Sequence, residues 1–369
     1  MKTVLCVVGT RPEAIKMAPV ILALRREPWA RVRVLATAQH RRMLDQLLGL
    51  FEIAPDVDLD LMRPDQALAD LTARMITALD ASLGQEDPDV VLAQGDTTTV
   101  LTTGLACFYR RIPFGHVEAG LRTGDLANPF PEEMNRTVAS RLARIHFAPT
   151  AAARANLLRE GIPDAAIHVT GNTVIDALLQ VAEQNVPIGP ELDATKRLVL
   201  VTAHRRESFG LPLREAFGAL RTLADRNHDI QVLYPIHLNP NVSGPAREIL
   251  GGHPRIVLCD PLDYAPFVSV MKRSHLIVTD SGGVQEEAPA LGKPVLVLRY
   301  ETERPEAVAE GVVKLVGTSP ERILAEAQRL LDDPQAYAAM ARGVSPYGDG
   351  HAADRIAAAL RQSLQPRDA

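Results

Sequence analysis

The stretch "TDSGGVQEEAP", which begins at Thr279, joins a short apolar run to a helical pattern through a serine and two glycines. Ser281, Gly282 and Gly283 therefore fall at a helix start, where free backbone N–H groups and the positive end of the helix dipole attract anions. Because glycine has no side chain, a ligand can approach this backbone closely. The pattern indicates a phosphate or diphosphate site. From this stretch alone, an ordinary N-cap followed by a tight turn explains the serine and the two glycines equally well.

Three carboxylates in the first half of the chain follow strand-like apolar runs or a proline-rich turn. Asp96 stands in "QGDTTT", Glu118 in "GHVEAGLRTGD" and Glu132 in "NPFPEEMNR". Each one alone is explained as a helix cap or as an acid in a first helical turn. The carboxyl ends of parallel strands meet at one edge of a sheet, so we expect the three carboxylates to lie together. Carboxylates crowded in a cleft raise one another's pKa, which suits proton transfer near neutral pH.

Cationic side chains follow other strand-like runs, most of them in the second half. They are Arg11 and Lys16 in "GTRPEAIK", His204 and Arg205 in "VTAHRRESFG", His237 in "YPIHLNPN" and Arg304 in "RYETERPEAV". A single cation of this kind is more often exposed to solvent, but repeated occurrence at strand ends favours a binding site. The sequence thus predicts a basic, glycine-lined phosphate site opposite an acid-lined pocket. This division suits a nucleotide-linked substrate.

The elements that must position these residues alternate between strands and helices. Strands are predicted at 4–8, 32–36, 90–93, 114–117 and 146–148, and again at 198–201, 230–234, 256–259, 276–278 and 295–298. Helices are predicted at 15–26, 41–50, 67–83, 100–109, 132–143 and 150–160. The polar stretch "EQNVPIGPELDATK" after Ala182 predicts a linker between the two series. The alternation predicts an α/β fold with two parallel sheets, each covered by helices on both faces.

The composition excludes several classes of function. The chain has 369 residues, a net charge of −5 and 4% aromatic residues, so no nucleic-acid partner is expected. Cys6, Cys107 and Cys259 are isolated, which argues against a disulfide framework and a zinc site. Neither a G-x-G-x-x-G nor a Walker-type motif occurs, so the sequence gives no usual motif for binding a nicotinamide cofactor or ATP. No signal peptide or membrane span is predicted, and the cytoplasm is the expected location.

A series of motifs closely resembles those of the bacterial non-hydrolysing UDP-N-acetylglucosamine 2-epimerase family. They are "GTRPEAIKMAPV", "AQHRRMLDQ", "QGDTTTV", "GHVEAGLRTGD", "PFPEEMNR", "GNTVIDAL", "TAHRRESFG", "YPIHLNPNV", "TDSGGVQEEAP" and "ERPEAV". The resemblance runs from Gly9 to "SPYGDG" near the end. It implies a glycosyltransferase-B fold, in which two Rossmann-like domains face a central cleft and a final helix crosses back to the first domain. The implied domains are 1–172 with 352–369, which carries the carboxylates, and 173–351, which binds UDP.

The resemblance also implies roles for the matching residues. Asp96, Glu118, Glu132 and His204 are the implied catalytic residues. The implied substrate-binding residues are Arg11, Lys16, Phe267, Ser281, Gly282, Gly283, Glu287 and Arg304. Among these, Ser281 to Gly283 hold the diphosphate, Glu287 accepts the ribose hydroxyls and Phe267 packs near the uracil. The family implies a homodimer that uses neither a cofactor nor a catalytic metal.

Family members can carry a second UDP-N-acetylglucosamine site that activates the enzyme. The residues here that match it are Gln39, Glu132, Arg205 and His237. Arg42 stands where a glutamine is usual, and Asp65 where an arginine is usual. One interpretation is that Arg42 and Asp65 pair with each other and weaken activation. The other is that Arg42 takes over the contact of the missing arginine.

The reaction implied by the resemblance is reversible epimerisation of UDP-N-acetylglucosamine to UDP-N-acetylmannosamine at carbon 2. It proceeds by elimination of UDP to a 2-acetamidoglucal and re-addition, and it supplies N-acetylmannosamine for cell-surface polysaccharide. Three alternatives are a retaining glycosyltransferase of the same fold, a hydrolysing epimerase and a non-catalytic nucleotide-sugar sensor. A sensor has no need of acids opposite the phosphates, and a glycosyltransferase gains less from three clustered acids.

Overall fold

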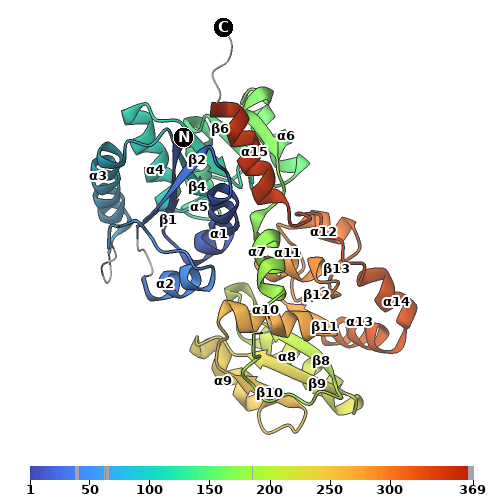
Figure 1. Cartoon of the computed structure of the whole chain (residues 1–369). Helices are drawn as coiled ribbons and strands as arrows, with labels where there is room; N and C mark the ends of the chain where they lie inside the picture. Colours follow the sequence, from blue (N-terminus) through green and yellow to red (C-terminus); the bar gives the residue numbers. More distant parts are fainter. Residues whose placement is uncertain (38–40, 62, 64–65, 185, 365–369) are drawn as a thin grey trace. The chain divides into compact units, whose positions relative to one another are not determined.

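The computed structural model describes residues 1–37, 41–61, 63, 66–184 and 186–364, and the chain forms two compact α/β units (Figure 1). The first unit contains Met1–Ala177 and Tyr347–Ala369, and the second contains Leu178–Pro346. The first boundary falls within helix α7 (Thr173–Ala182). The segment 183–196, predicted as a linker, therefore belongs to the second unit, where its described residues form turns and irregular backbone.

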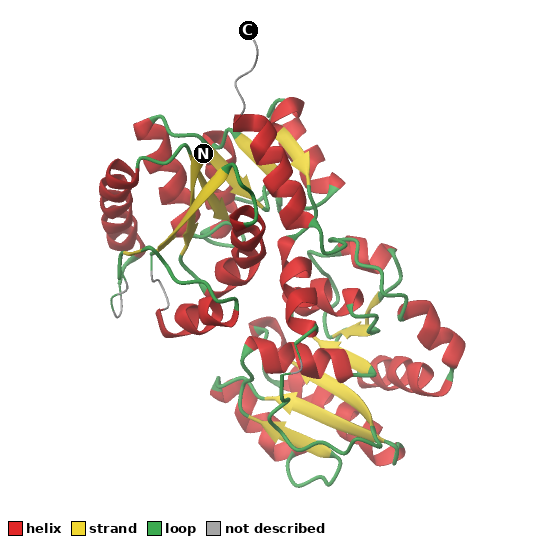
Figure 2. Cartoon of the chain, viewed as in Figure 1, coloured by secondary structure: helices red, strands yellow, loops and turns green. Residues whose placement is uncertain are grey.

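The first unit is built on a parallel sheet of seven strands in the order β3-β2-β1-β4-β5-β6-β7, flanked by helices (Figure 2). The strands are β1 (Lys2–Val8), β2 (Ala30–Ala36), β3 (Val57–Asp58), β4 (Val90–Gln94), β5 (Phe114–Val117), β6 (Ile145–Ala148) and β7 (Ile167–Val169). The helices are α1 (Arg11–Arg25), α2 (Arg41–Leu50), α3 (Leu68–Glu86), α4 (Thr98–Arg110), α5 (Glu132–Leu142), α6 (Ala151–Arg159), a short 3-10 turn η1 (Asp164–Ala166) and the first part of α7. The strands predicted for the first half are all confirmed.

Burial explains why the central strands read as continuous apolar runs. The side chains from Val4 to Val8 in β1 and from Val90 to Ala93 in β4 are fully buried, because helices cover both faces of the sheet. On one face, Met75 and Leu79 of α3 belong to the same buried cluster as β1 and β4. The sheet is therefore a rigid support for the loops at its carboxyl edge.

The last helix of the chain, α15 (Ala352–Leu364), belongs to the first unit, as predicted. It packs against α1 and β6. The carboxylate of Asp176 accepts the backbone N–H of Ala352 at 3.3 Å and of Ala353 at 2.8 Å. An acid at the start of a helix satisfies N–H groups that have no partner within the helix. This contact fixes the end of the chain onto the first unit.

The second unit has a parallel sheet of six strands in the order β10-β9-β8-β11-β12-β13. The strands are β8 (Arg197–Thr202), β9 (Ile230–Pro235), β10 (Ile256–Cys259), β11 (Leu276–Thr279), β12 (Val295–Val297) and β13 (Val313–Leu315). The helices are η2 (Arg206–Ser208), α8 (Leu211–Arg226), α9 (Pro240–Leu250), α10 (Tyr264–Arg273), α11 (Gly282–Ala290), α12 (Pro305–Ala309), α13 (Pro320–Asp332) and α14 (Pro334–Met340). No helix in the described part of the chain combines the length and the apolar character needed to cross a bilayer.

Candidate active site

Three neighbouring strands bring candidate residues of the first unit to one edge of its sheet. β1, β4 and β5 are adjacent and parallel, so the loops that follow them leave at the same edge. The loop after β1 leads into Arg11 and Lys16 of α1, the loop after β4 carries Asp96, and Glu118 directly follows β5. The strand order thus explains why residues far apart in the sequence share one edge.

Lys16 and Glu118 form a direct ion pair at this edge. Nζ of Lys16 lies 2.5 Å from Oε2 of Glu118, and the two side chains are only 14% and 9% exposed. Glu118 also has a backbone φ of +63°, a left-handed conformation that costs free energy for a residue with a side chain. The backbone therefore turns sharply after β5 and directs the carboxylate toward α1.

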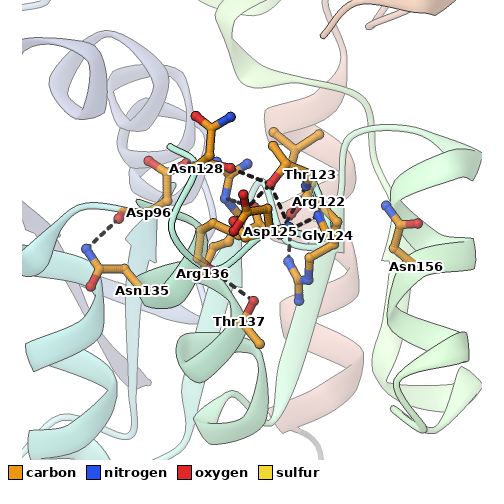
Figure 3. Close-up of polar contacts among 12 residues, drawn as sticks. Asp96, Arg122, Thr123, Gly124, Asp125, Asn128, Asn135, Arg136, Thr137 and Asn156 are labelled. Carbon is orange, nitrogen blue, oxygen red and sulfur yellow. Dashed lines mark hydrogen bonds and ion pairs between the residues drawn. The ribbon is translucent and has the colours of Figure 1, made fainter. Parts of the chain in front are cut away.

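Helix α5 holds Asp96 from two sides (Figure 3). Nδ2 of Asn135 donates a hydrogen bond to the backbone carbonyl oxygen of Asp96 at 2.9 Å. Nη2 of Arg136 lies 3.4 Å from Oδ2 of Asp96. The Asp96 side chain is 30% exposed, so its carboxylate is positioned but still accessible.

The two adjacent acids at the start of α5 differ in burial. Glu132 is half-buried, whereas the Glu133 side chain is only 2% exposed. Glu133 accepts the backbone N–H groups of Thr123 at 3.0 Å and Gly124 at 3.1 Å. A cavity of about 340 Å³ opens beside these groups, with Gly124 and Glu133 in its lining.

Glu13 is a further buried carboxylate of this edge, and the sequence did not single it out. It accepts the backbone N–H groups of Gly9 at 2.6 Å and Thr10 at 3.1 Å, and the Thr97 hydroxyl at 2.5 Å. Burial raises the pKa of this carboxyl, and the hydrogen bonds oppose that rise. Glu13 therefore ties the loop after β1 to the loop that carries Asp96.

A buried histidine, His116, supports the loop after β4, which carries Asp96. Nε2 of His116, on β5, lies 2.7 Å from the backbone carbonyl oxygen of Gly95, directly before Asp96. Burial lowers the pKa of His116 to about 3. The imidazole is therefore neutral at physiological pH, and its Nε2–H donates a hydrogen bond to the carbonyl oxygen of Gly95.

In the second unit, helix α11 begins at Gly282 after β11, so the helix start predicted at the two glycines is confirmed. Two guanidinium groups lie beside this helix start. A Cβ atom added to Gly282 would lie 3.8 Å from Nη2 of Arg205 and 3.9 Å from Nη2 of Arg304. A Cβ atom added to Gly283, which is exposed, would meet only Oγ of Ser281 at 3.9 Å. Positive charge and open backbone thus coincide at this helix start.

Asp280, which the sequence analysis did not select, organises the loop after β8. It is 1% exposed, and its Oδ2 accepts the backbone N–H groups of His204 at 2.6 Å and Arg205 at 2.8 Å. Its Oδ1 lies 3.3 Å from Nδ1 of His204. One buried carboxylate therefore sets the positions of both His204 and Arg205.

The His204 ring stacks on the His237 ring, with centroids 5.4 Å apart and an interplanar angle of 15°. Burial lowers the pKa of His204, and the nearby Asp280 carboxylate partly offsets this effect. The stack joins one residue predicted to be catalytic to one predicted to be regulatory, because β8 and β9 are neighbours.

The other predicted residues of the second unit have well-defined places. Arg304 forms an ion pair with Glu286 of α11. Glu287 is buried on the same helix, and Phe267 is half-buried on α10. Of the predicted regulatory residues, Gln39 and Asp65 lie outside the described residues, as does the side chain of Arg42.

Comparison with known proteins decides the family. A family model described as UDP-N-acetylglucosamine 2-epimerase matches residues 22–361. The chain is 54% identical to the UDP-N-acetylglucosamine 2-epimerase of Escherichia coli, and the match covers 98% of each chain. The chain belongs to the UDP-N-acetylglucosamine 2-epimerase family. The family resemblance predicted from the motifs is confirmed.

Solved structures of 2-epimerases agree with this result. A putative UDP-N-acetylglucosamine 2-epimerase from Listeria monocytogenes is 48% identical, with a TM-score of 0.93 over 99% of this chain and 97% of that chain. The Neisseria meningitidis UDP-GlcNAc 2-epimerase bound to UDP-GlcNAc is 47% identical, with a TM-score of 0.87 over 98% of this chain and 100% of that one. These likenesses confirm the predicted fold class, α/β with two parallel sheets of glycosyltransferase-B type.

Proposed function

We propose that this chain is a non-hydrolysing UDP-N-acetylglucosamine 2-epimerase, an isomerase that interconverts UDP-N-acetylglucosamine and UDP-N-acetylmannosamine. The observation that carries this proposal is the pairing of Lys16 with Glu118 in a sharply turned loop of a chain that belongs to this family. The Neisseria relative is a UDP-GlcNAc complex, which supports the same substrate class here. The product is proposed to supply N-acetylmannosamine for cell-surface polysaccharide, and the working form is proposed to be a homodimer.

The second unit is proposed to hold the nucleotide. The backbone N–H groups at the start of α11, with Ser281, Gly282 and Gly283, bind the diphosphate, and the guanidinium groups of Arg205 and Arg304 neutralise its charge. Glu287 accepts the ribose hydroxyls, and Phe267 packs near the uracil. His204, whose Nδ1 lies 3.3 Å from Asp280, stands in the loop beside this helix start. Groups that stabilise the departing diphosphate lower the barrier of the first chemical step.

The proton on carbon 2 of the sugar is only weakly acidic, because no carbonyl group is adjacent to it. Breaking the bond between carbon 1 and the diphosphate oxygen, with its electron pair leaving on UDP, gives carbon 1 oxocarbenium character. A carboxylate then removes the proton from carbon 2, and a double bond forms between carbons 1 and 2 of the resulting 2-acetamidoglucal. Return of a proton to the opposite face of carbon 2 and attack of UDP on carbon 1 complete the epimerisation. No water is consumed.

Residues of the first unit are proposed to transfer these protons. Glu118 is held in place by its ion pair with Lys16, and Asp96 is positioned by Arg136 while remaining accessible. Glu132, half-buried at the start of α5, is the third carboxylate. Removal and return of the proton on opposite faces require two acid–base groups, or one group and a moved intermediate.

The test is incubation of the purified chain with UDP-N-acetylglucosamine in deuterated water, with nothing else added, followed by NMR. The expected product is UDP-N-acetylmannosamine with deuterium at carbon 2. Free N-acetylmannosamine and UDP would identify a hydrolysing epimerase instead. Sugar transfer to an added acceptor would identify a glycosyltransferase, and an unlabelled product would exclude the elimination mechanism.

A further inference from the structure

Glu133 connects segments that carry the candidate carboxylates. Its Oε1 accepts the backbone N–H groups of Thr123 and Gly124, in the segment between β5 and α5. Its Oε2 lies 3.1 Å from Nε of Arg136, in a geometry too oblique for a hydrogen bond, so that this contact is an ion pair. With 2% of its side chain exposed, Glu133 is not accessible enough to meet a sugar directly.

Arg136 contacts both Glu133 and Asp96. Residues three positions apart lie on the same face of a helix, so Arg136 stands beside Glu133. Its Nη2 lies 3.4 Å from Oδ2 of Asp96, and the Arg136 side chain is 11% exposed. A buried guanidinium between two carboxylates is attracted by both, and its position depends on the balance between them.

We infer that Glu133 is a positioning residue for epimerisation: it holds Arg136, and Arg136 in turn fixes where the Asp96 carboxylate lies. This role rests on the proposed function, in which Asp96 meets the sugar. When the charge of Glu133 is removed, Asp96 is the ion-pair partner that remains for Arg136 among the described contacts. The guanidinium then closes on Asp96 and draws its carboxylate away from the sugar.

Glu133→Gln isolates this role. The amide oxygen of glutamine still accepts the N–H groups of Thr123 and Gly124, while its NH2 group faces the guanidinium of Arg136 and no longer attracts it. We expect kcat to fall about 10- to 100-fold, as is usual when a reacting group is misplaced by a fraction of an ångström to an ångström. KM and the affinity for UDP, measured by calorimetry, stay within about twofold, because binding of the nucleotide is not touched.

Glu326→Gln is the matched control. Glu326 and Arg329 form an ion pair of the same three-residue spacing at 3.0 Å on α13, and Glu326 also pairs with Lys314. This variant removes these more exposed ion pairs of the second unit and should keep wild-type kcat. A double-mutant cycle with Arg136→Gln then tests the route of action. If Glu133 acts through Arg136, E133Q causes no further loss of kcat in the R136Q background.

Several outcomes would overturn the role. Penalties that multiply in the double variant would show that Glu133 acts independently of Arg136. Loss of helical circular dichroism or of UDP affinity in E133Q would show that Glu133 only supports the fold. An active wild type with unchanged kcat in E133Q would reject the role alone, whereas an inactive wild type would reject the proposed function and the role together.

Discussion

Nζ of Lys16 and Oε2 of Glu118 lie 2.5 Å apart although 102 residues separate them in the chain. The contact joins the second turn of α1 to the residue that follows β5, across the carboxyl edge of the first sheet. Because both side chains are largely buried, the ammonium group and the carboxylate depend on each other for charge compensation. The pair therefore holds the Glu118 carboxylate at the proposed site beside a compensating positive charge.

Glu118→Gln keeps the shape of the side chain but removes the charge and the proton acceptor. We expect kcat to fall about 10²- to 10⁴-fold, the usual contribution of a general acid or base. UDP affinity should be unchanged, which calorimetric titration checks beside steady-state kinetics. Asp80→Asn is the control, because Asp80 is ion-paired with Arg110 on the outside of the same unit. Near-normal turnover in E118Q would remove Glu118 from proton transfer.

Gly283→Ala separates binding from stability. The added methyl group meets only Oγ of Ser281 at 3.9 Å, and alanine favours a helix over glycine by about 0.5–1 kcal/mol. We therefore expect the melting temperature to stay the same or rise, while UDP affinity falls about tenfold or more because the methyl group stands between the ligand and the backbone. Unchanged UDP affinity would place the diphosphate elsewhere.

Gly9→Ala should behave in the opposite way. A Cβ atom at Gly9 would lie 2.3 Å from Oγ1 of Thr99 and 2.5 Å from Oγ1 of Thr37, and both threonines are fully buried. Relief of this overlap requires shifts that cost about 1–3 kcal/mol. Urea unfolding of G9A should show that loss, and a variant as stable as the wild type would contradict the packing described for this loop.

His116 makes stability depend on pH. Its pKa is about 3 in the folded protein, against an ordinary value of 6.5, because burial disfavours the charged form. Below about pH 6.5 the unfolded chain binds a proton that the folded chain excludes, so the free energy of unfolding falls by roughly 1.4 kcal/mol per pH unit for this residue. Glutamine at position 116 does not titrate, and the stability of H116Q should fall less steeply between pH 6.5 and pH 4. The exposed His351, changed to glutamine, is the control and should leave the slope unchanged.

Arg42 stands where the family usually has a glutamine, and Asp65 where it usually has an arginine. These two differences are predicted to weaken activation by UDP-N-acetylglucosamine. UDP-N-acetylmannosamine alone should then be converted from the start of the reaction, without a marked lag. Progress curves begun from substrate treated to remove traces of UDP-N-acetylglucosamine measure this directly. Strict dependence on added UDP-N-acetylglucosamine would show that the activating site is retained.

The sequence predicted the central strands well and missed three strands at the sheet edges. β3, β7 and β13 are two or three residues long, and each ends its sheet in the strand order. A central strand covered on both faces reads as a continuous apolar run, whereas a short edge strand has too few residues to show a pattern. The order of strands, which brings the candidate loops together, comes from the packing of helices on the sheet rather than from any one segment.

The candidate site could be located from the sequence, but not the residues that support it. Glu132 and Glu133 are neighbours of the same type, and only packing shows that the second is buried and bound to two backbone N–H groups. Asp280 was hidden for the same reason, since His204 and Arg205 lie 76 and 75 positions away. Glu13 has two local partners, Gly9 and Thr10, but its contact with Thr97 spans 84 positions. Burial of a charged side chain is a property of the folded surroundings, which no local pattern records.

The contact of Asp176 with the start of α15 also sets an order of events during synthesis. Every strand of the first sheet leaves the ribosome before residue 170, but α15 leaves it only after residues 178–346, which form the second unit. At about 5–20 residues per second, synthesis from Arg25 to Leu364 takes roughly 17–68 s, and for that time α1 lacks the helix that packs against it. The second unit consists of one continuous segment, Leu178–Pro346, so its residues are all synthesised before α15. The half of the protein that is synthesised first is therefore the half that is completed last.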